Sequence, residues 1–302
     1  MRKLAASEGP DSAGLLSEFD LAIVGETLDS RGRAAASCLS ALAERTLTVT
    51  GYDADAYTLL VDGRAVDADD LSTRLSELTV RHAVLEATTL GFVELFLALR
   101  ALFEHGVTEI DILYVEPDSY AKPRRSRSLL LSRREFELSE DVPGYRAIPG
   151  ATMILTDRVR HRGVFFLGFE ERRLAVAFED FQMLRPRDCN VVFGVPAFQA
   201  GWEMDSFSNN VNVLVDRGFS DSVRFCGAND PVSAYELLQK VYSALDSGER
   251  MFVAPIGTKP HGVACALFAA ETAGVGILYD HPRRKAGRSD GTGTWHLFSI
   301  RD

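Results

Sequence analysis

The sequence predicts an α/β fold with mainly parallel sheets and with helices on both faces of each sheet. Short apolar runs alternate with longer segments whose apolar residues recur at helical spacing. The short runs are almost continuously apolar, which is typical of strands buried on both faces of a parallel sheet. Two distant segments also share one pattern, so we expect two related halves.

The first half is expected at residues 19–120, after a small and polar leader at 1–18 that we expect to be flexible. Its strands are expected at 21–24, 46–53, 57–63, 82–86 and 109–117, and its helices up to Glu44, near 68–78 and at 91–105. The dipeptide Asp62-Gly63 predicts a tight hairpin turn, and Gly106 predicts the end of the preceding helix.

The second half is expected at residues 151–302, where the alternation of strands and helices resumes. A connecting segment at 121–150 precedes it, because this stretch is first basic, then acidic, and contains several prolines. The strands of the second half are expected at 164–171, 190–198, 222–230, 250–255 and 275–282, followed by a final strand at 294–300.

The two halves share a repeated pattern. The strand–helix–strand segment 82–117 can be laid on 250–282, and both segments end in Leu-Tyr-x-x-Pro. Each half also opens alike, because AIVGET is followed by Arg31 and FFLGFEE by Arg172. Any two strand–helix–strand units look similar, but the repeated motif favours a duplication. The chain would then be a fused pair of Rossmann-like halves related by a pseudo-two-fold axis.

Polar residues gather where the expected strands end, and ligands of parallel sheets collect at these ends. In the first half they are Glu86, Thr88, Thr89 and Glu116. In the second half they are Thr258, Lys259, His261, Asp280, His281, Arg283, Arg284 and Arg288. We expect the threonines, Lys259, His261 and the arginines to bind a ligand. The carboxylates and His281 are the candidate acids and bases.

The turn Gly257-Thr258-Lys259-Pro260 has the composition of an anion site at the start of a helix. Thr258 can cap the first turn, and the helix dipole together with the Lys259 ammonium attracts negative charge. The loop 280–289 adds four basic side chains and would emerge at the same sheet edge. Alternatively, the turn is an ordinary capped helix start and the basic loop is a solvated run of charge.

Composition limits the function further. A net charge of -10 argues against a general nucleic-acid-binding protein, although a local basic patch is compatible with a small anionic ligand. The 302 residues contain no apolar run long enough to span a bilayer and no secretory start, so we expect a cytoplasmic protein.

Known catalytic and metal-binding strings are absent from the sequence. There is no P-loop, no G-x-S-x-G elbow joining a strand to a helix, no H-E-x-x-H and no strand-following G-x-G-x-x-G. The cysteines are scattered without metal-type spacing, and Asp53-x-Asp55 is interpreted as a turn. We therefore expect neither a metal site nor a cofactor.

Two fused Rossmann-like units with Thr/Lys turns and arginines at the strand ends resemble the sensor domains called CARF and SAVED. This resemblance covers residues 20–300, and its nearest positions are the turns Thr88-Thr89 and Thr258-Lys259. It implies recognition of a cyclic or linear oligonucleotide signal in bacterial defence. Because the chain has no room for a separate effector, the resemblance also implies an effector on another protein, or processing of the ligand by this chain.

Three hypotheses follow. The first is a cytoplasmic sensor that binds an anionic, nucleotide-like ligand and acts through a protein partner that carries an effector activity. The second is a nucleotide-processing hydrolase of glycosidic or phosphate-ester bonds, with Glu86, Glu116, Asp280 or His281 as acid and base. The third is a non-enzymatic interaction subunit whose arginine loop docks an acidic partner. None of them involves a membrane.

Overall fold

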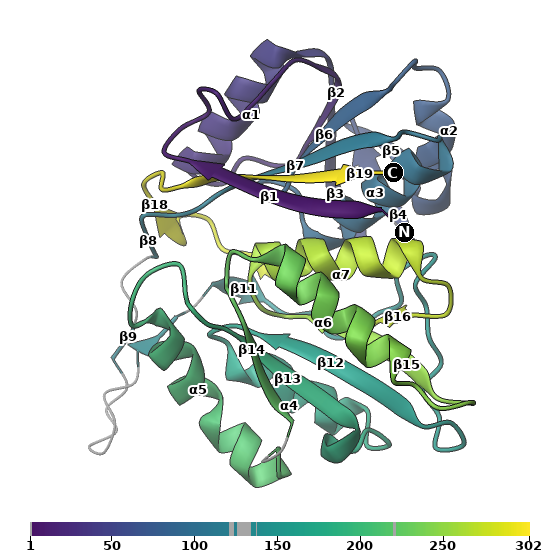
Figure 1. Cartoon of the computed structure of the whole chain (residues 1–302), viewed down its shortest axis with the longest axis vertical. Helices are drawn as coiled ribbons and strands as arrows, with labels where there is room; N and C mark the ends of the chain where they lie inside the picture. The colour runs from purple at the N-terminus through teal and green to yellow at the C-terminus, as the bar shows by residue number, and fades with distance from the viewer. Residues whose placement is uncertain (1, 121–123, 126–133, 137, 220–221) are drawn as a thin grey trace. The chain divides into compact units, whose positions relative to one another are not determined.

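The computed structural model describes residues 2–120, 124–125, 134–136, 138–219 and 222–302 (Figure 1). The chain forms two compact units. Unit 1 consists of Met1–Tyr120, Ile148–Gly150 and Ala286–Asp302, and unit 2 consists of Ala121–Ala147 and Ala151–Lys285. Each unit contains its own main sheet.

The main sheet of unit 1 has eight strands within the described residues, in the order β1-β19-β7-β6-β2-β3-β4-β5. The strands are β1 (Lys3–Gly9), β2 (Phe19–Val24), β3 (Ala43–Asp53), β4 (Thr58–Val61), β5 (Arg64–Asp67), β6 (His82–Glu86), β7 (Glu109–Val115) and β19 (Trp295–Arg301). The central strands β7, β6, β2 and β3 are parallel, and the outer strands on both sides pair antiparallel. The short strands β8 (Ser119–Tyr120) and β18 (Ser289–Asp290) form a separate pair.

Helices cover both faces of this sheet (Figure 1). They are α1 (Ser30–Leu42), α2 (Leu71–Leu75) and α3 (Phe92–Glu104), with a short 3-10 helix η1 (Ala68–Asp70) before α2. On one face, Ala35 and Leu39 of α1 pack in a cluster with Phe19, Val84 and Leu113 of the strands. On the other face, α3 packs against β3, β6 and α2.

The main sheet of unit 2 is parallel throughout its described strands, in the order β14-β13-β12-β15-β16. These strands are β12 (His161–Leu167), β13 (Cys189–Gly194), β14 (Val223–Cys226), β15 (Arg250–Pro255) and β16 (Gly276–Ile277). The helices are α4 (Glu171–Asp180), α5 (Trp202–Arg217), α6 (Pro231–Ser243) and α7 (Lys259–Glu271), with η2 (Pro186–Asp188) before β13. Short strands β9 (Arg124–Arg125) and β10 (Arg134–Glu135) pair, as do β11 (Ser139–Asp141) and β17 (Arg283–Arg284).

The core of unit 2 lies on both faces of this sheet. Leu174 and Phe178 of α4 and Leu214 of α5 pack with Phe165 and Phe193 of the strands. Helices α6 and α7 lie against each other on the opposite face (Figure 1). Helix α7 is apolar around its whole circumference, and this explains why most of its side chains are buried.

Strand order places a topological switch point in each unit. Counted along the chain, the strands of unit 2 follow the order 3-2-1-4-5, which is that of the Rossmann fold. The parallel strands of unit 1, taken as β3-β2-β6-β7, follow the order 2-1-3-4. The chain therefore reverses direction between β12 and β15 in unit 2, and between β2 and β6 in unit 1.

The predicted α/β class, with parallel strands and helices on both faces, is confirmed, although the sheet of unit 1 is mixed rather than mainly parallel. The predicted turn at Asp62-Gly63 is also confirmed, since it joins β4 to β5 with φ values of 49° and 74°. These angles at both central residues are those of the tight hairpin turn that Asp-Gly favours.

The leader differs from the flexible segment expected at residues 1–18. Residues Lys3–Gly9 form β1, which pairs antiparallel with β19 along its whole length, from Lys3 opposite Arg301 to Gly9 opposite Trp295. Most side chains of β1 are exposed, and its stability comes from backbone hydrogen bonds to β19. Because an exposed edge strand needs no apolar pattern, no local feature of residues 3–9 predicts β1.

The unit boundaries also differ from those expected at 121–150 and 151–302. The final strand, β19, belongs to unit 1, where it lies between β1 and β7. Much of the expected connecting segment lies outside the described residues, but β11 belongs to unit 2 and residues 148–150 to unit 1. Strand pairing over such sequence separations depends on tertiary structure and not on local periodicity.

Candidate functional site

The carboxyl edge of the unit 2 sheet is closed tightly at the switch point. Gly168 follows β12 and Gly257 follows β15, and these strands are neighbours. A Cβ atom on Gly168 would lie 3.2 Å from the Ile256 carbonyl oxygen, and one on Gly257 would lie 2.9 Å from the Leu167 carbonyl oxygen. The two loops thus meet through their backbones, and glycine is needed for this approach.

The predicted cap at Thr258 is confirmed. Thr258 is the N-cap of α7, and its hydroxyl oxygen accepts a hydrogen bond from the His261 amide at 3.4 Å. The same hydroxyl donates to the Ala228 carbonyl at 2.7 Å, which ties the turn to the loop after β14. Lys259 is the first residue of α7 and is partly exposed. The turn therefore has both features that the sequence predicted: Thr258 caps the helix, and Lys259 is an accessible lysine at its first position.

His261 differs from the ligand contact that we expected, because it is fully buried. Its ring lies 4.9 Å from that of Phe166, and its Nε2 is 2.9 Å from the Gly227 carbonyl oxygen and 3.2 Å from Cys226 Sγ. Its Nδ1 is buried without a hydrogen-bond partner in the part of the chain that the structure describes. Burial lowers the pKa of His261 to about 4, so the ring is neutral at pH 7.

Asp280 is the counter-ion of a buried arginine and not a candidate acid or base. Arg173 of α4 donates to the Asp280 carboxylate from Nε at 2.7 Å and from Nη2 at 2.5 Å, and neither residue has more than slight exposure. Arg173 Nη1 donates to the Ile256 carbonyl at 3.2 Å. This guanidinium therefore joins the start of α4 to the chain that follows β15 and β16, and it forms a bidentate ion pair with Asp280.

The basic residues Arg283 and Arg284 form β17, opposite Asp141 and Ser139 of β11. The Ser139 amide and hydroxyl donate to the Glu170 carboxylate at 3.1 and 3.0 Å, which connects this pair of strands to the loop after β12. Arg283 is exposed and Arg284 is partly exposed. Arg283 and Arg284 thus follow β16, and Lys259 begins α7 at the same edge of the sheet. Acidic residues such as Asp141 lie beside the two arginines.

The other two predicted residues of this loop, His281 and Arg288, have different surroundings. His281 has a φ of 50°, and its Nε2 is 3.2 Å from the Arg146 carbonyl oxygen. Its ring packs against Tyr279 with centroids 5.2 Å apart. Arg288 belongs to unit 1 and not to unit 2.

The matching turn of unit 1, at residues 86–89, has its polar side chains buried in the interior. The Glu86 carboxylate is fully buried and accepts hydrogen bonds from the Thr88 amide at 2.9 Å, the Thr89 amide at 2.7 Å and the Thr89 hydroxyl. Thr89 Oγ1 accepts from the Gly25 amide at 2.8 Å, and Thr88 Oγ1 accepts from the Val115 amide at 3.0 Å. Burial raises the pKa of Glu86. These three side chains brace β2, β6 and β7, and none of them reaches solvent.

Gly25 makes the same kind of contact as Gly168, and the contact is closer. A Cβ atom on Gly25 would lie 2.4 Å from the Thr89 carbonyl oxygen. We expect Gly25→Ala to lower the free energy of unfolding by about 1–3 kcal/mol, because backbone must move to make room. Urea denaturation measures this, with Gly168→Ala as the milder case. Equal stability of Gly25→Ala and wild type would contradict the contact.

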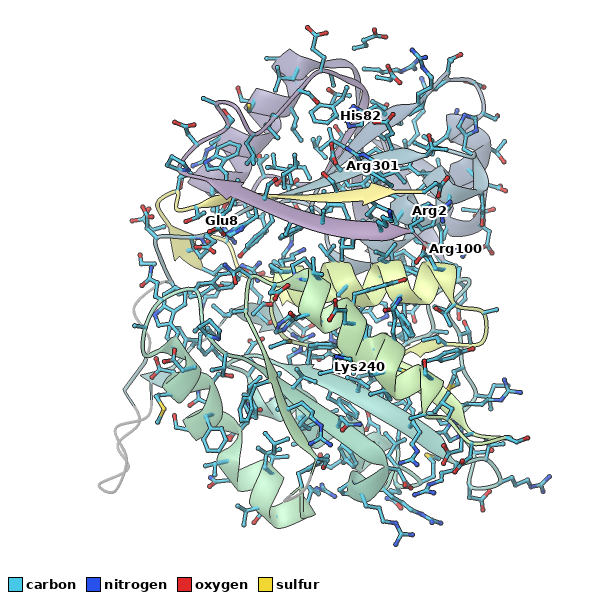
Figure 2. All side chains as sticks on the ribbon, viewed as in Figure 1. Arg2, Glu8, His82, Arg100, Lys240 and Arg301 are labelled. Carbon is cyan, nitrogen blue, oxygen red and sulfur yellow. The ribbon has the colours of Figure 1, made fainter. Side chains whose placement is uncertain are left out.

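Glu116 acquires a partner that the sequence could not reveal. His296 of β19 lies with Nε2 2.6 Å from the Glu116 carboxylate and Nδ1 3.2 Å from the carboxylate of Glu8. Glu8 is a residue of β1 and is labelled in Figure 2. His296 is 2% exposed, and Glu116 is nearly buried. The pair is separated by 180 positions in the chain, so no local motif signals it.

Two buried arginines occupy corresponding places in the two units. Arg31 lies 5.8 Å from the Tyr114 ring, and Arg173 lies 5.9 Å from the Tyr279 ring. Both tyrosines belong to the repeated Leu-Tyr-x-x-Pro motif. The sequence comparison selected Arg172, but that residue is exposed and Arg173 is the one that lies inside.

Each arginine also binds the residue that follows its tyrosine. Arg31 Nη1 donates to the Val115 carbonyl at 2.8 Å, whereas Arg173 binds the Asp280 side chain. The counter-ion of Arg31 is instead Asp29, at 2.9 Å from Nε. The position of the arginine is thus shared, and the chemistry of its partner differs.

Comparisons with known proteins give no family. No family model matches the chain, and no curated protein matches it. One solved structure, described as "Structure of A-type Ketoreductases from Modular Polyketide Synthase", is 13% identical and matches with a TM-score of 0.22. The match covers 84% of this chain and 63% of that one. Because the TM-score is so low, we draw no conclusion about function from this match.

Two negative findings concern only the described residues. No helix there has both the length and the apolar character needed to cross a membrane. Nor do the described ranges contain a group of three or more His, Cys, Asp or Glu side chains placed to hold a metal ion.

Proposed function

We propose that the protein binds an anionic, nucleotide-like ligand at the carboxyl edge of the unit 2 sheet and acts as a sensor. The observation that carries the proposal is the position of Lys259. This partly exposed lysine begins α7 directly beside the switch point between β12 and β15. Parallel sheets bind ligands at this point, and the start of a helix attracts negative charge.

Two features of the same edge support an anion. Arg283 and Arg284 follow β16, and arginine binds phosphate or carboxylate with two parallel hydrogen bonds. The Asp280 charge, which would otherwise repel an anion, is balanced by Arg173.

Binding without turnover is favoured over the hydrolase hypothesis. Glu86 and Asp280 are fully buried and use their oxygens in structural hydrogen bonds, so neither can exchange a proton with a bound substrate. Glu116 is nearly buried against His296.

The proposal includes a sensor built from two related halves, as in the CARF and SAVED domains. The shared placement of Arg31 with Tyr114 and of Arg173 with Tyr279 supports a common origin of the halves. The ligand would be a cyclic or linear oligonucleotide, and the effector would be another protein. Unit 2 would then be the binding half, because the turn of unit 1 is internally bonded.

Thermal-shift and calorimetric titrations test this proposal. Cyclic oligonucleotides, linear oligonucleotides, mononucleotides and inorganic phosphate are the probes. We expect one of the nucleotides to raise the melting temperature of the protein. Lys259→Ala should weaken the binding of that nucleotide by about 10–100-fold, because one charged hydrogen bond is lost. Lys240→Ala on α6 (Figure 2) is the matched control and should bind normally.

The outcomes separate the hypotheses. Chromatography of the ligand after incubation should recover it intact, and turnover would favour the hydrolase. A Lys259→Ala variant that binds as tightly as wild type, or a protein that no nucleotide stabilises, would overturn the proposed site.

A further inference from the structure

The amino edge of the unit 2 sheet carries a concentration of arginines. Three chain segments meet there: 157–162 leads into β12, 185–188 leads into β13, and 246–250 leads into β15. The segments are in contact, since the Arg250 amide donates to the Arg160 carbonyl at 3.0 Å and the Arg160 side chain binds Asp188. This edge lies at the opposite end of the strands from the proposed ligand site, so it is a separate feature of unit 2.

The inner layer of this edge is a network of two arginines and two carboxylates. Arg160 Nε donates to the Asp188 carboxylate at 2.7 Å, and Arg160 Nη1 lies 3.4 Å from the Glu249 carboxylate. Arg162 Nε donates to both oxygens of Glu249 at 3.1 Å. The side chains of Asp188 and Glu249 are 4% and 6% exposed, whereas that of Arg160 is 47% exposed. The two carboxylates are thus covered by guanidinium groups, and the charges of the network balance each other.

The outer layer of this edge consists of exposed arginines. We call the five of them the amino-edge arginine surface: Arg158, Arg160, Arg185, Arg187 and Arg250. Within the part of the chain that the structure describes, all of them except Arg160 lack an ion-pair partner. The acidic residues exposed on the same three segments are Asp157 and Asp246. Guanidinium groups of like charge repel each other, and an anionic partner removes this repulsion.

We propose that the amino-edge arginine surface binds an acidic segment of a partner protein, in which Asp and Glu side chains pair with the arginines. Charge complementarity selects this partner. The inner layer shows the pairing that this edge forms, which is guanidinium with carboxylate. The surface consists of arginine rather than lysine, and the planar guanidinium binds a carboxylate with two parallel hydrogen bonds. The proposal does not depend on the ligand site at the carboxyl edge.

The charge of the rest of the chain favours a short acidic segment over an extended anion. The three segments contain six arginines and four acidic residues, so they contribute +2 to the net charge of -10, and the rest of the chain carries -12. A nucleic acid or an anionic membrane extends beyond the surface and is repelled by this remaining charge, since such anions bind to widely basic surfaces. A short segment rich in Asp and Glu contacts the arginines alone.

Fluorescence anisotropy of a labelled decaglutamate peptide, titrated with the full chain, tests the proposal. We expect a Kd of about 1–100 µM at about 50 mM salt and weaker binding at about 200 mM salt, because ions screen exposed charges. Arg185→Glu with Arg187→Glu should raise the Kd about tenfold or more, since two attractive charges become repulsive. Arg158→Glu with Arg250→Glu, on the other two segments, should have the same effect. All four side chains are exposed, so circular dichroism should show the wild-type fold in both variants.

Arg172→Glu with Arg224→Glu is the matched control. Both residues are exposed in unit 2 outside the surface, and the pair changes the net charge by the same amount, so the Kd should change by less than about threefold. A control as weak as the surface variants would show that net charge alone attracts the peptide, and it would overturn the proposal. Absence of peptide binding at low salt would overturn it as well. So would tighter binding of polyuridine RNA or phosphatidylserine vesicles than of the peptide, lost in the same surface variants, because the partner would then be a phosphate ligand.

Discussion

Arg173→Met is expected to lower the free energy of unfolding by about 3–5 kcal/mol, the usual cost of removing one partner of a buried ion pair. Asp280 is 0% exposed and would be left in the interior without its counter-ion. The Ile256 carbonyl would lose its donor at the same time. Urea denaturation of the wild type and the variant, monitored by tryptophan fluorescence and circular dichroism, measures the difference.

Two further variants make this prediction specific. Arg172→Met changes the neighbouring exposed arginine and should alter stability by less than about 0.5 kcal/mol. Arg173→Met combined with Asp280→Leu removes both charges and should recover much of the loss, because an apolar pair needs no counter-ion. If Arg173→Met were no more destabilised than Arg172→Met, the ion pair would not hold the edge of unit 2 together.

Lowering the pH from about 6.5 to about 4 is expected to cost about 3 kcal/mol of stability through His261 alone. Burial lowers the folded-state pKa of His261 from 6.5 to about 4. Between these values the unfolded chain binds a proton that the folded chain does not bind, so unfolding becomes easier as the pH falls. Above about pH 6.5 both states are neutral, and the contribution is constant.

The comparison with His261→Gln isolates this effect. Glutamine does not titrate and keeps a donor for the Gly227 carbonyl, so the variant should lose stability less steeply with acid than the wild type. Burial also lowers the pKa of His161, which acts in the same direction and is present in both proteins. Denaturant midpoints at pH 7 and at pH 4.5 are the measurement. Parallel slopes in the two proteins would contradict the assignment of a buried neutral His261.

The sequence predicted those features that arise from neighbours along the chain. Apolar runs identified the parallel strands, because burial on both faces leaves no polar alternation. Asp62-Gly63 predicted the hairpin turn, and Thr258 predicted the cap of α7, since each depends on a few adjacent residues. The polar residues at the strand ends were also found, because strand ends follow directly from the strands.

What those polar residues do could not be predicted in the same way. Glu86 was a candidate acid or base and His261 a candidate ligand contact, yet both lie in the interior with structural partners. The sequence gives the identity of a side chain at a strand end but not the side to which it points. That side depends on how the following loop packs against its neighbour.

The partners of charged groups depended on tertiary structure alone. Arg173 and Asp280 are 107 positions apart, and Glu116 and His296 are 180 positions apart. Adjacent residues on a helix point in directions that differ by about 100°. To choose Arg173 over Arg172, the position of the buried face of α4 would therefore have to be predicted to within one residue. The sequence by itself therefore determined the buried parallel strands, the turn at Asp62-Gly63 and the cap at Thr258, but not the exposed edge strand β1. Only the folded chain decided which charges meet, because contacts between distant segments are set by packing and leave no local pattern.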